Sequence, residues 1–128
     1  MSLSRLNLTL WVPVAAWAAA ILVLNSIPNP PSAPPTVVPV DKIVHFMEYC
    51  GLGALLFRAA RGSAWKHPLA WAIALGVAYG VADEVHQAYL PTRYAELADV
   101  LADAVGASAG ALILRLTRRR REPETDLP

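Results

Sequence analysis

The sequence predicts an all-α integral membrane protein, a bundle of four transmembrane helices. Hydrophobic residues make up 55% of the 128 residues and charged residues only 16%, whereas soluble domains carry about 25% charged residues. Four apolar stretches of membrane-spanning length follow one another, and lysines and arginines gather at their ends. The sequence shows no nucleic-acid signature. With Cys50 as the only cysteine, no internal disulfide can form.

The first apolar stretch predicts a helix over about residues 6–25, long enough to cross a bilayer. A cleaved signal peptide is the alternative, because Arg5 precedes the stretch and three consecutive alanines lie inside it. The apolar run continues beyond those alanines, so we favour a membrane span. Residues 26–40 are rich in proline, which removes backbone donors and prevents a helix. We expect an outer connecting loop there rather than a proline-rich ligand segment.

Three further spans follow with short connections. We expect them over about residues 41–60, 68–90 and 96–117, with a basic tail at 118–128. Asp41 is a suitable N-cap for the second span. Pro68 suits the first turn of the third span and Pro91 ends it, and the arginine run closes the fourth span.

The distribution of basic residues predicts the orientation of the bundle. One side of the spans carries most of them: Arg5, Arg58, Arg61, Lys66, Arg115 and the run Arg118–Arg121. The other side carries Lys42 and Arg93. Because lysine and arginine are enriched in cytoplasmic segments, both termini and the tail are expected in the cytoplasm. Loop 26–40 and the polar stretch 83–103 are then expected to face outward.

Polar and small residues recur at helical spacing in the last three spans and predict one shared surface. Residues three and four apart lie on the same side of a helix, and small-residue stripes mark faces where membrane helices pack closely. The stripes are Asp41, His45, Glu48, Gly51 and Leu55 in the second span, Ala72, Gly76, Gly80, Asp83, Glu84 and Gln87 in the third, and Asp99, Asp103, Gly106 and Gly110 in the fourth. We therefore expect the carboxylates to converge inside the bundle.

The expected depth of these groups makes them costly unless their charge is balanced. At about 1.5 Å per residue, Glu48 lies about 20 Å from Arg61 and Asp83 about 22 Å from Pro68, inside hydrocarbon about 30 Å thick. The carboxylates of this region are Asp41, Glu48, Asp83, Glu84, Glu96, Asp99 and Asp103, and they face only Lys42, Arg93 and two histidines. Buried like charges cannot all stay ionised. We expect an outer-leaflet recess that holds a divalent cation, neutral carboxylic acids or a cationic ligand group.

Candidate roles follow from residue type and spacing. His45 and Glu48 lie one turn apart, which suits a catalytic base or, together with Asp83, a divalent-metal site. Asp83 and Glu84 are candidate catalytic acids. The candidate ligand-binding residues are Asp41, Lys42, Tyr49, Gln87, Arg93, Asp99 and Asp103. Structural alternatives stay open, namely Asp41 and Lys42 as cap and interface anchor, Arg93 as counter-ion of Asp83 or Asp99, and the whole network as an interhelical lock.

Two of these segments form a pair of recognisable motifs. The first is Asp41-Lys42-Ile43-Val44-His45-Phe46-Met47-Glu48-Tyr49 with Gly51-Leu52, and the second is Asp83-Glu84-Val85-His86-Gln87 with Pro91-Thr92-Arg93, Asp99 and Gly106. Together they resemble the VanZ-like family of small integral membrane proteins. The resemblance implies one domain over residues 1–128 and a multi-pass location in the cell membrane. The founding member is associated with resistance to the glycopeptide antibiotic teicoplanin, which implies a role in the bacterial cell envelope.

Three functions are compatible with these predictions. The first is an envelope protein whose recess binds an anionic membrane-lipid head group or a lipid-linked cell-wall precursor, with Lys42 and Arg93 as contacts. The second is a membrane hydrolase or transferase that acts on such a lipid with the base and acids named above. The third is a structural or proton-relay network. No nucleophile elbow, phosphate-binding loop or zinc-protease motif occurs, and nothing in the sequence indicates an oligomeric state.

Overall fold

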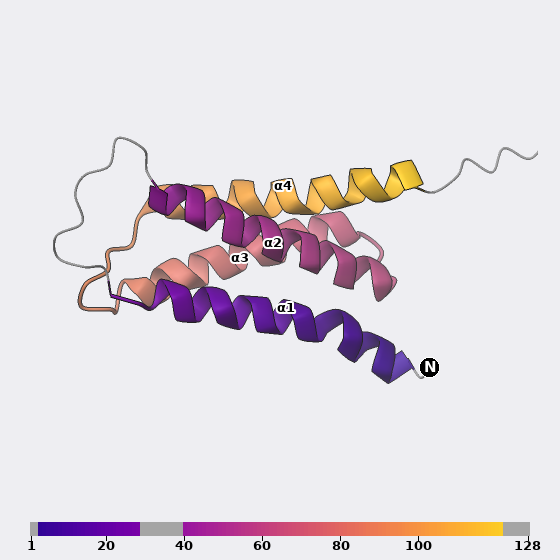
Figure 1. The fold of residues 1–128 in the computed structure, drawn as a ribbon, viewed down its shortest axis with the longest axis horizontal. Coiled ribbons are helices and arrows are strands. Elements are labelled where there is room, and N and C mark those ends of the chain that lie inside the picture. Colours follow the sequence, from indigo (N-terminus) through magenta and orange to yellow (C-terminus); the bar gives the residue numbers. More distant parts are fainter. Residues whose placement is uncertain (1–2, 29–39, 122–128) are drawn as a thin grey trace, which may run out of the picture.

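The protein is all-α, as the composition predicted. The computed structural model describes residues 3–28 and 40–121. Within them the helices are α1 (Leu3–Asn25), α2 (Val40–Gly62), α3 (Pro68–Gln87) and α4 (Leu97–Arg121). The helices run along the long axis of the molecule, and the start of α1 lies at the same end as the end of α4 (Figure 1). This arrangement is that of an even number of spans, whereas the orientation relative to the cytoplasm stays a prediction.

The helix boundaries differ from the predicted ones by up to four residues. Helix α3 ends at Gln87 rather than near residue 90, because the next residues turn back through bonds such as Leu90 N to Gln87 O, at 3.0 Å. Helix α4 continues through the arginine run, since arginine is a good helix former. Helix α2 begins at Val40, so Asp41 lies in its first turn rather than at the N-cap. Most of the proline-rich loop lies outside the described residues.

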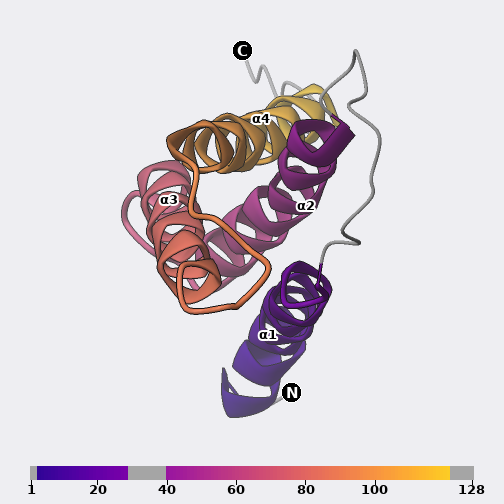
Figure 2. The ribbon, with the colours of Figure 1, turned by 90° about the vertical axis from the view of Figure 1, so that its left-hand side faces the viewer.

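Helices α2, α3 and α4 form a three-helix core, and α1 packs on its side. Within the described residues α1 contacts α2 and, over a short length, α3, but not α4, and Figure 2 shows it below the triangle of the other three. Two of the side-chain bonds that hold it there end on backbone carbonyls: Trp17 Nε1 donates to Glu48 O at 2.8 Å, and Tyr79 Oη donates to Ala18 O at 2.6 Å. A third joins two side chains, Trp11 Nε1 and Ser63 Oγ, at 3.0 Å.

The closest packing lies between α2 and α4. A Cβ atom at Gly106 would overlap the carbonyl of Phe46, and one at Gly110 would overlap the carbonyl of Cys50. Backbones that approach this closely are typical of small-residue stripes in membrane helices, where dispersion contacts rather than the hydrophobic effect drive association. The stripe predicted on the fourth span therefore does pack against a neighbour.

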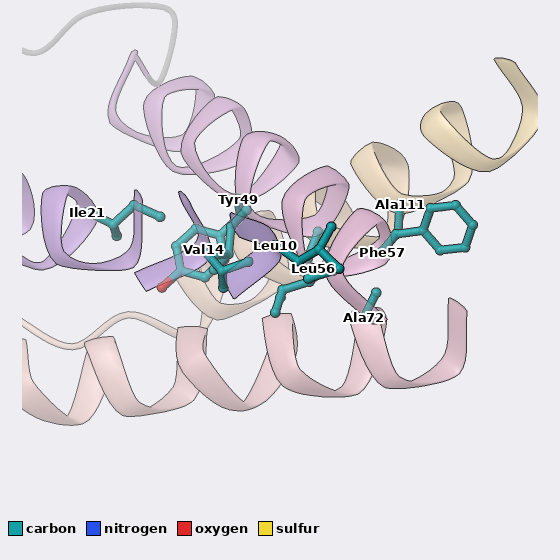
Figure 3. Packing of buried hydrophobic residues seen from close by; sticks show 11 residues of the cluster. Leu10, Val14, Ile21, Tyr49, Leu56, Phe57, Ala72 and Ala111 are labelled. Atoms are coloured by element: carbon teal, nitrogen blue, oxygen red, sulfur yellow. The ribbon is translucent and has the colours of Figure 1, made fainter. Parts of the chain in front are cut away.

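The surface of the molecule is apolar along much of its length, and its described interior is apolar except at one end. Large apolar side chains on every helix are exposed, including Val23, Met47, Val85 and Val105, while the interior core is a thin cluster of residues such as Leu10, Val14, Tyr49 and Leu56 (Figure 3). All four helices are long and apolar enough to cross a bilayer. A surface of this kind is stable in lipid and not in water, so the fold is that of a multi-pass membrane protein.

Candidate functional site

Polar side chains gather at the end of the bundle where α1 and α3 finish and α2 and α4 begin (Figure 1). The buried polar and charged residues of the described chain all belong to this region: Asn25, His45, Asp83, Glu84, Gln87, Asp99 and Asp103. We call this set the acidic cluster. The predicted convergence of α2, α3 and α4 is therefore present, although the side chains fill the interior rather than line an open recess.

His45 and Asp103 form the centre of the acidic cluster. The His45 Nδ1 and Asp103 Oδ1 atoms are 2.9 Å apart, and the two side chains are 5% and 0% exposed. Asp103 fits only because Gly80 of α3 faces it: a Cβ at Gly80 would lie 3.0 Å from Asp103 Oδ2 and 2.9 Å from Asp103 Cβ. Three helices thus enclose one histidine–carboxylate pair.

Asp83 is held by donors from two helices. Asn25 Nδ2 donates to Asp83 Oδ2 at 2.7 Å, and Gln87 Nε2 donates to the same oxygen at 3.3 Å. The other oxygen, Asp83 Oδ1, is buried without a hydrogen-bond partner. Asn25 was not among the predicted site residues. The available signal was an amide at the C-terminal end of the first span, near the end of the bundle that holds the carboxylates.

Glu84 and Lys42 connect the cluster to the surface. Glu84 accepts the backbone N–H of Glu96 at 2.9 Å and the Gln87 amide at 3.3 Å. The Lys42 ammonium binds Asp41 at 2.9 Å and Glu96 at 2.6 Å, and it also pairs with the buried Asp99. A single cation therefore joins two exposed carboxylates to a buried one.

Arg93 makes a contact that the sequence did not indicate. Its Nε and Nη2 donate to the backbone oxygen of Ile27 at 3.1 and 2.7 Å. The α3–α4 connection is thereby tied to the end of α1. Lys42, not Arg93, is the counter-ion of Asp99, so the suggested structural role of Arg93 as a carboxylate partner was wrong.

The buried face of α2 differs from the predicted stripe. His45 is buried as expected, but Asp41 is exposed and Glu48 only half-buried. The residues that continue the face are Tyr49, Leu52, Gly53 and Leu56. The reason is that α2 packs against all three other helices: Gly51, in the predicted stripe, faces Trp17 of α1, while Gly53 faces Ala107 of α4.

Tyr49 and Glu48 complete the inner side of the cluster. Tyr49 is fully buried, and its hydroxyl has no hydrogen-bond partner. Glu48 Oε2 is likewise buried without a partner. These atoms add to the buried acceptors that the protein itself leaves unsatisfied.

Two groups of side chains in the described residues are close enough to share a metal ion. Each offers three ligand atoms within 4.8 Å of one another: His45, Asp83 and Asp103 in one group, and His45, Glu84 and Asp99 in the other. Two members of the predicted metal set, His45 and Asp83, thus come together, while Glu48 belongs to neither group. Asp103 takes the third place instead.

The acidic cluster occupies only one half of the bundle. Deeper in the core, the buried residues are small or apolar, among them Leu52, Leu56, Ala107 and Ala111. No chain of described polar side chains crosses this layer to the opposite end.

These features define a class: a four-span membrane protein with a histidine and several carboxylates enclosed in one half of its bundle. Residues 2–118 match the VanZ/LLP1 family model. The chain therefore belongs to that family. This confirms the resemblance seen in the two motifs. No curated protein and no solved structure matches the chain.

Proposed function

We propose that this protein binds the phosphate head group of an anionic envelope lipid, or of a lipid-linked cell-wall precursor, at the rim of the acidic cluster in the cell membrane. The Lys42 ammonium carries the proposal. Its side chain is 22% exposed, and two of its three partners, Asp41 and Glu96, are 61% and 53% exposed. An exposed carboxylate binds an ammonium only weakly, so a phosphate can replace it on Lys42 with charge-assisted bonds of the same kind.

Arg93 supports anion binding at the same end. Its guanidinium is half-buried and is held by a neutral carbonyl oxygen, that of Ile27. A guanidinium bound to a carbonyl keeps its full positive charge, and its planar fork matches phosphate oxygens. The large apolar side chains exposed around the bundle leave the acyl or prenyl chain of such a ligand in contact with membrane-facing helix surface.

The buried carboxylates require a second component, and we propose a divalent cation bound by His45, Asp83 and Asp103. Asp83 Oδ1 and Asp103 Oδ2 are buried without hydrogen-bond partners. Unpaired buried carboxylate oxygens cost several kcal/mol unless they are protonated or bind a cation. One imidazole with carboxylates suits Zn²⁺ or Mn²⁺.

The second group of potential ligands fits a cation less well. Glu84 already accepts bonds from Gln87 and from the backbone of Glu96. Asp99 already pairs with the ammonium of Lys42. Both oxygens of Glu84 and one of Asp99 are thus already engaged, whereas Asp83 Oδ1 and Asp103 Oδ2 are not. We therefore assign the cation to the group that contains Asp103.

The lipid proposal is tested with a polyprenyl phosphate added to the purified protein and measured by native mass spectrometry. Lys42→Gln is expected to weaken the lipid adduct by about tenfold, because one charge-assisted contact is lost. Glu96→Gln is the matched control and should retain or strengthen the adduct, since it removes the carboxylate that competes for Lys42. Equal adducts in the wild type and Lys42→Gln would contradict the proposal.

The cation proposal has its own test, titration of the protein with Mn²⁺ followed by electron paramagnetic resonance. Asp103→Asn should weaken Mn²⁺ binding at least about tenfold, because a ligand oxygen loses its charge. Asp41→Asn changes an exposed aspartate of the same region and should leave Mn²⁺ binding unchanged. If the wild type immobilises neither Mn²⁺ nor Zn²⁺ at millimolar concentration, the cation assignment fails, and the lipid test still stands.

The His45–Asp103 pair favours a second candidate, hydrolysis of a phosphate ester or pyrophosphate on the same kind of lipid. A carboxylate bonded to Nδ1 orients the imidazole and leaves Nε2 as a general base. The test is phosphate release from a polyprenyl pyrophosphate, with His45→Gln as the inactive variant and His86→Gln as the control on an exposed histidine. If the wild type releases no phosphate with or without Mn²⁺, this candidate is removed.

In cells, the proposal predicts a contribution to glycopeptide resistance. Were the bound lipid a cell-wall precursor, expression of the chain in a susceptible bacterium should raise the inhibitory concentration of teicoplanin. Lys42→Gln should abolish the increase and Glu96→Gln should retain it, in parallel with lipid binding. An increase that is the same in both variants would separate any resistance from this site.

A further inference from the structure

The opposite end of the bundle contains a cavity of about 520 Å³ between the end of α2, the α2–α3 loop and α4. Its cationic lining residues are Arg61, Lys66, Arg115 and Arg119. They come from three separate segments of the chain, so the fold and not a local run in the sequence brings them to one space. None of the residues that line this cavity belongs to the acidic cluster.

The cavity has an apolar wall as well as a cationic rim. Phe57, which is 3% exposed, and Leu69 both line it. Sites that combine a large apolar surface with a few charged groups of one sign suit amphiphilic ligands, and the volume lies within the range of about 300–1,000 Å³ usual for ligand sites.

Three of the cationic lining residues have no carboxylate partner in the described part of the protein. Within residues 3–28 and 40–121, Lys66, Arg115 and Arg119 form no ion pair with a carboxylate. Cations held near one another at a membrane surface raise the local concentration of anions. The cavity is therefore suited to an anionic group.

The loop that supplies Lys66 is held in one conformation. Ala64 adopts a positive φ of 58°, and Trp65 N donates to Ala60 O at 3.0 Å, which closes the end of α2 in the manner of a Schellman motif. The Trp65 ring packs on Trp11 and Trp71 with centroid distances of 5.2 and 5.6 Å. Tryptophans are enriched at the level of lipid head groups, so the aromatic group places this end of the bundle at that depth.

We propose that this cavity binds the head group of an anionic bilayer phospholipid, of the phosphatidylglycerol type, in the leaflet at the end that holds the start of α1 and the end of α4. The lipid phosphate is bound by Arg115, Arg119 and Lys66, and an acyl chain lies along Phe57 and Leu69. Basic pockets between transmembrane helices recognise phospholipid head groups in this way. The inference is independent of the proposed function, because no residue is shared with the acidic cluster.

The experiment measures phosphatidylglycerol adducts on the full chain in detergent by native mass spectrometry, with phosphatidylcholine as the zwitterionic comparison. The double variant Arg115→Gln/Arg119→Gln should weaken phosphatidylglycerol binding by about tenfold or more. The matched control is Arg118→Gln/Arg120→Gln, which removes the same charge from the same helix, and neither of its arginines lines this cavity. Its binding should change by less than about twofold.

Further binding measurements distinguish this site from the alternatives. Inorganic phosphate at millimolar concentration should not displace the lipid, because it lacks the acyl chain; displacement would assign the site to free phosphate and overturn the proposal. In a Lys42→Gln background, which lacks the proposed lipid contact at the acidic cluster, Arg115→Gln/Arg119→Gln should still weaken phosphatidylglycerol binding, which distinguishes this site from the acidic cluster. Equal loss in the two double variants, or equal binding of the two lipids, would reduce the cavity to general surface charge. Lys66→Gln, a change in a surface loop, gives the same test if the double variant does not fold.

Discussion

The two ends of this bundle both concentrate charge, but they do so in opposite ways. At the acidic end the carboxylates Asp83, Glu84, Asp99 and Asp103 are buried, and each has at least one partner from another part of the chain. At the basic end Arg119 and Lys66 are exposed around a cavity. The comparison teaches that burial, not the amount of charge, decides whether a charged residue contributes mainly to stability or mainly to binding.

The largest expected effect comes from disrupting the close packing between α2 and α4. Gly106→Val would drive its side chain into the backbone carbonyl of Phe46, where nothing can rotate away, so we expect a loss of at least about 3 kcal/mol. Thermal unfolding in detergent measures it. Gly62→Ala is the control, because its Cβ meets only the movable side chain of Leu10. Equal stability of the two variants would show that α2 and α4 are not closely packed at Gly106.

The next effect concerns the centre of the acidic end. His45→Ala leaves Asp103 buried without its partner and should destabilise the protein by about 3 kcal/mol. Adding Asp103→Ala to that variant should restore part of the loss, since the second change removes the unpaired group. A double-mutant cycle by denaturant titration gives the coupling. Additive losses would mean that the pair does not act as a unit.

A smaller effect is expected at the contact between α1 and the cluster. Asn25→Leu removes the closest donor to Asp83 and should cost about 1 kcal/mol, within the range found for interhelical hydrogen bonds in membranes. Asn7→Leu, an exposed amide near the other end of α1, whose side-chain oxygen accepts a 3.4 Å bond from Ser63, should cost less than half as much. Thermal unfolding of the two variants compares the ends of one helix directly.

The smallest effect is expected at the basic end. Arg119→Gln removes an exposed charge that has no ion-pair partner among the described residues, so the stability should change by less than about 0.5 kcal/mol. The same variant should weaken phosphatidylglycerol binding. A loss of stability as large as that of His45→Ala would contradict the conclusion that charge at the basic end contributes mainly to binding.

The sequence sufficed for the fold class and for the packing faces of α3 and α4. In those helices every buried site residue lies on a stripe of Gly or Ala at spacings of three and four, as in Gly76–Gly80–Asp83. In α2 the stripe was displaced, because Gly51 faces Trp17 of α1 and Gly53 faces Ala107 of α4. Small residues on two faces of one helix leave two candidate stripes, and spacing alone does not say which one holds the site.

The contacts of Arg93 and Asn25 were beyond sequence reasoning for a different reason. Arg93 binds a backbone oxygen, which every residue possesses, so no residue type marks its partner. Asn25 reaches Asp83 only because α1 packs beside α3 near the C-terminal ends of both helices, and α1 carries no polar stripe that would predict this. Residue identity revealed the charged groups, whereas the choice among their partners depended on how the helices pack.

The small apolar residues between the two charged ends have an electrical consequence. In the predicted orientation the carboxylates lie toward the outside and the arginines toward the cytoplasm, with low-dielectric protein between them. A cell that maintains a negative interior stabilises this arrangement, since each elementary charge that spans the potential contributes about 2.3 kcal/mol per 100 mV. The membrane potential itself would then favour one direction of insertion and oppose its reversal.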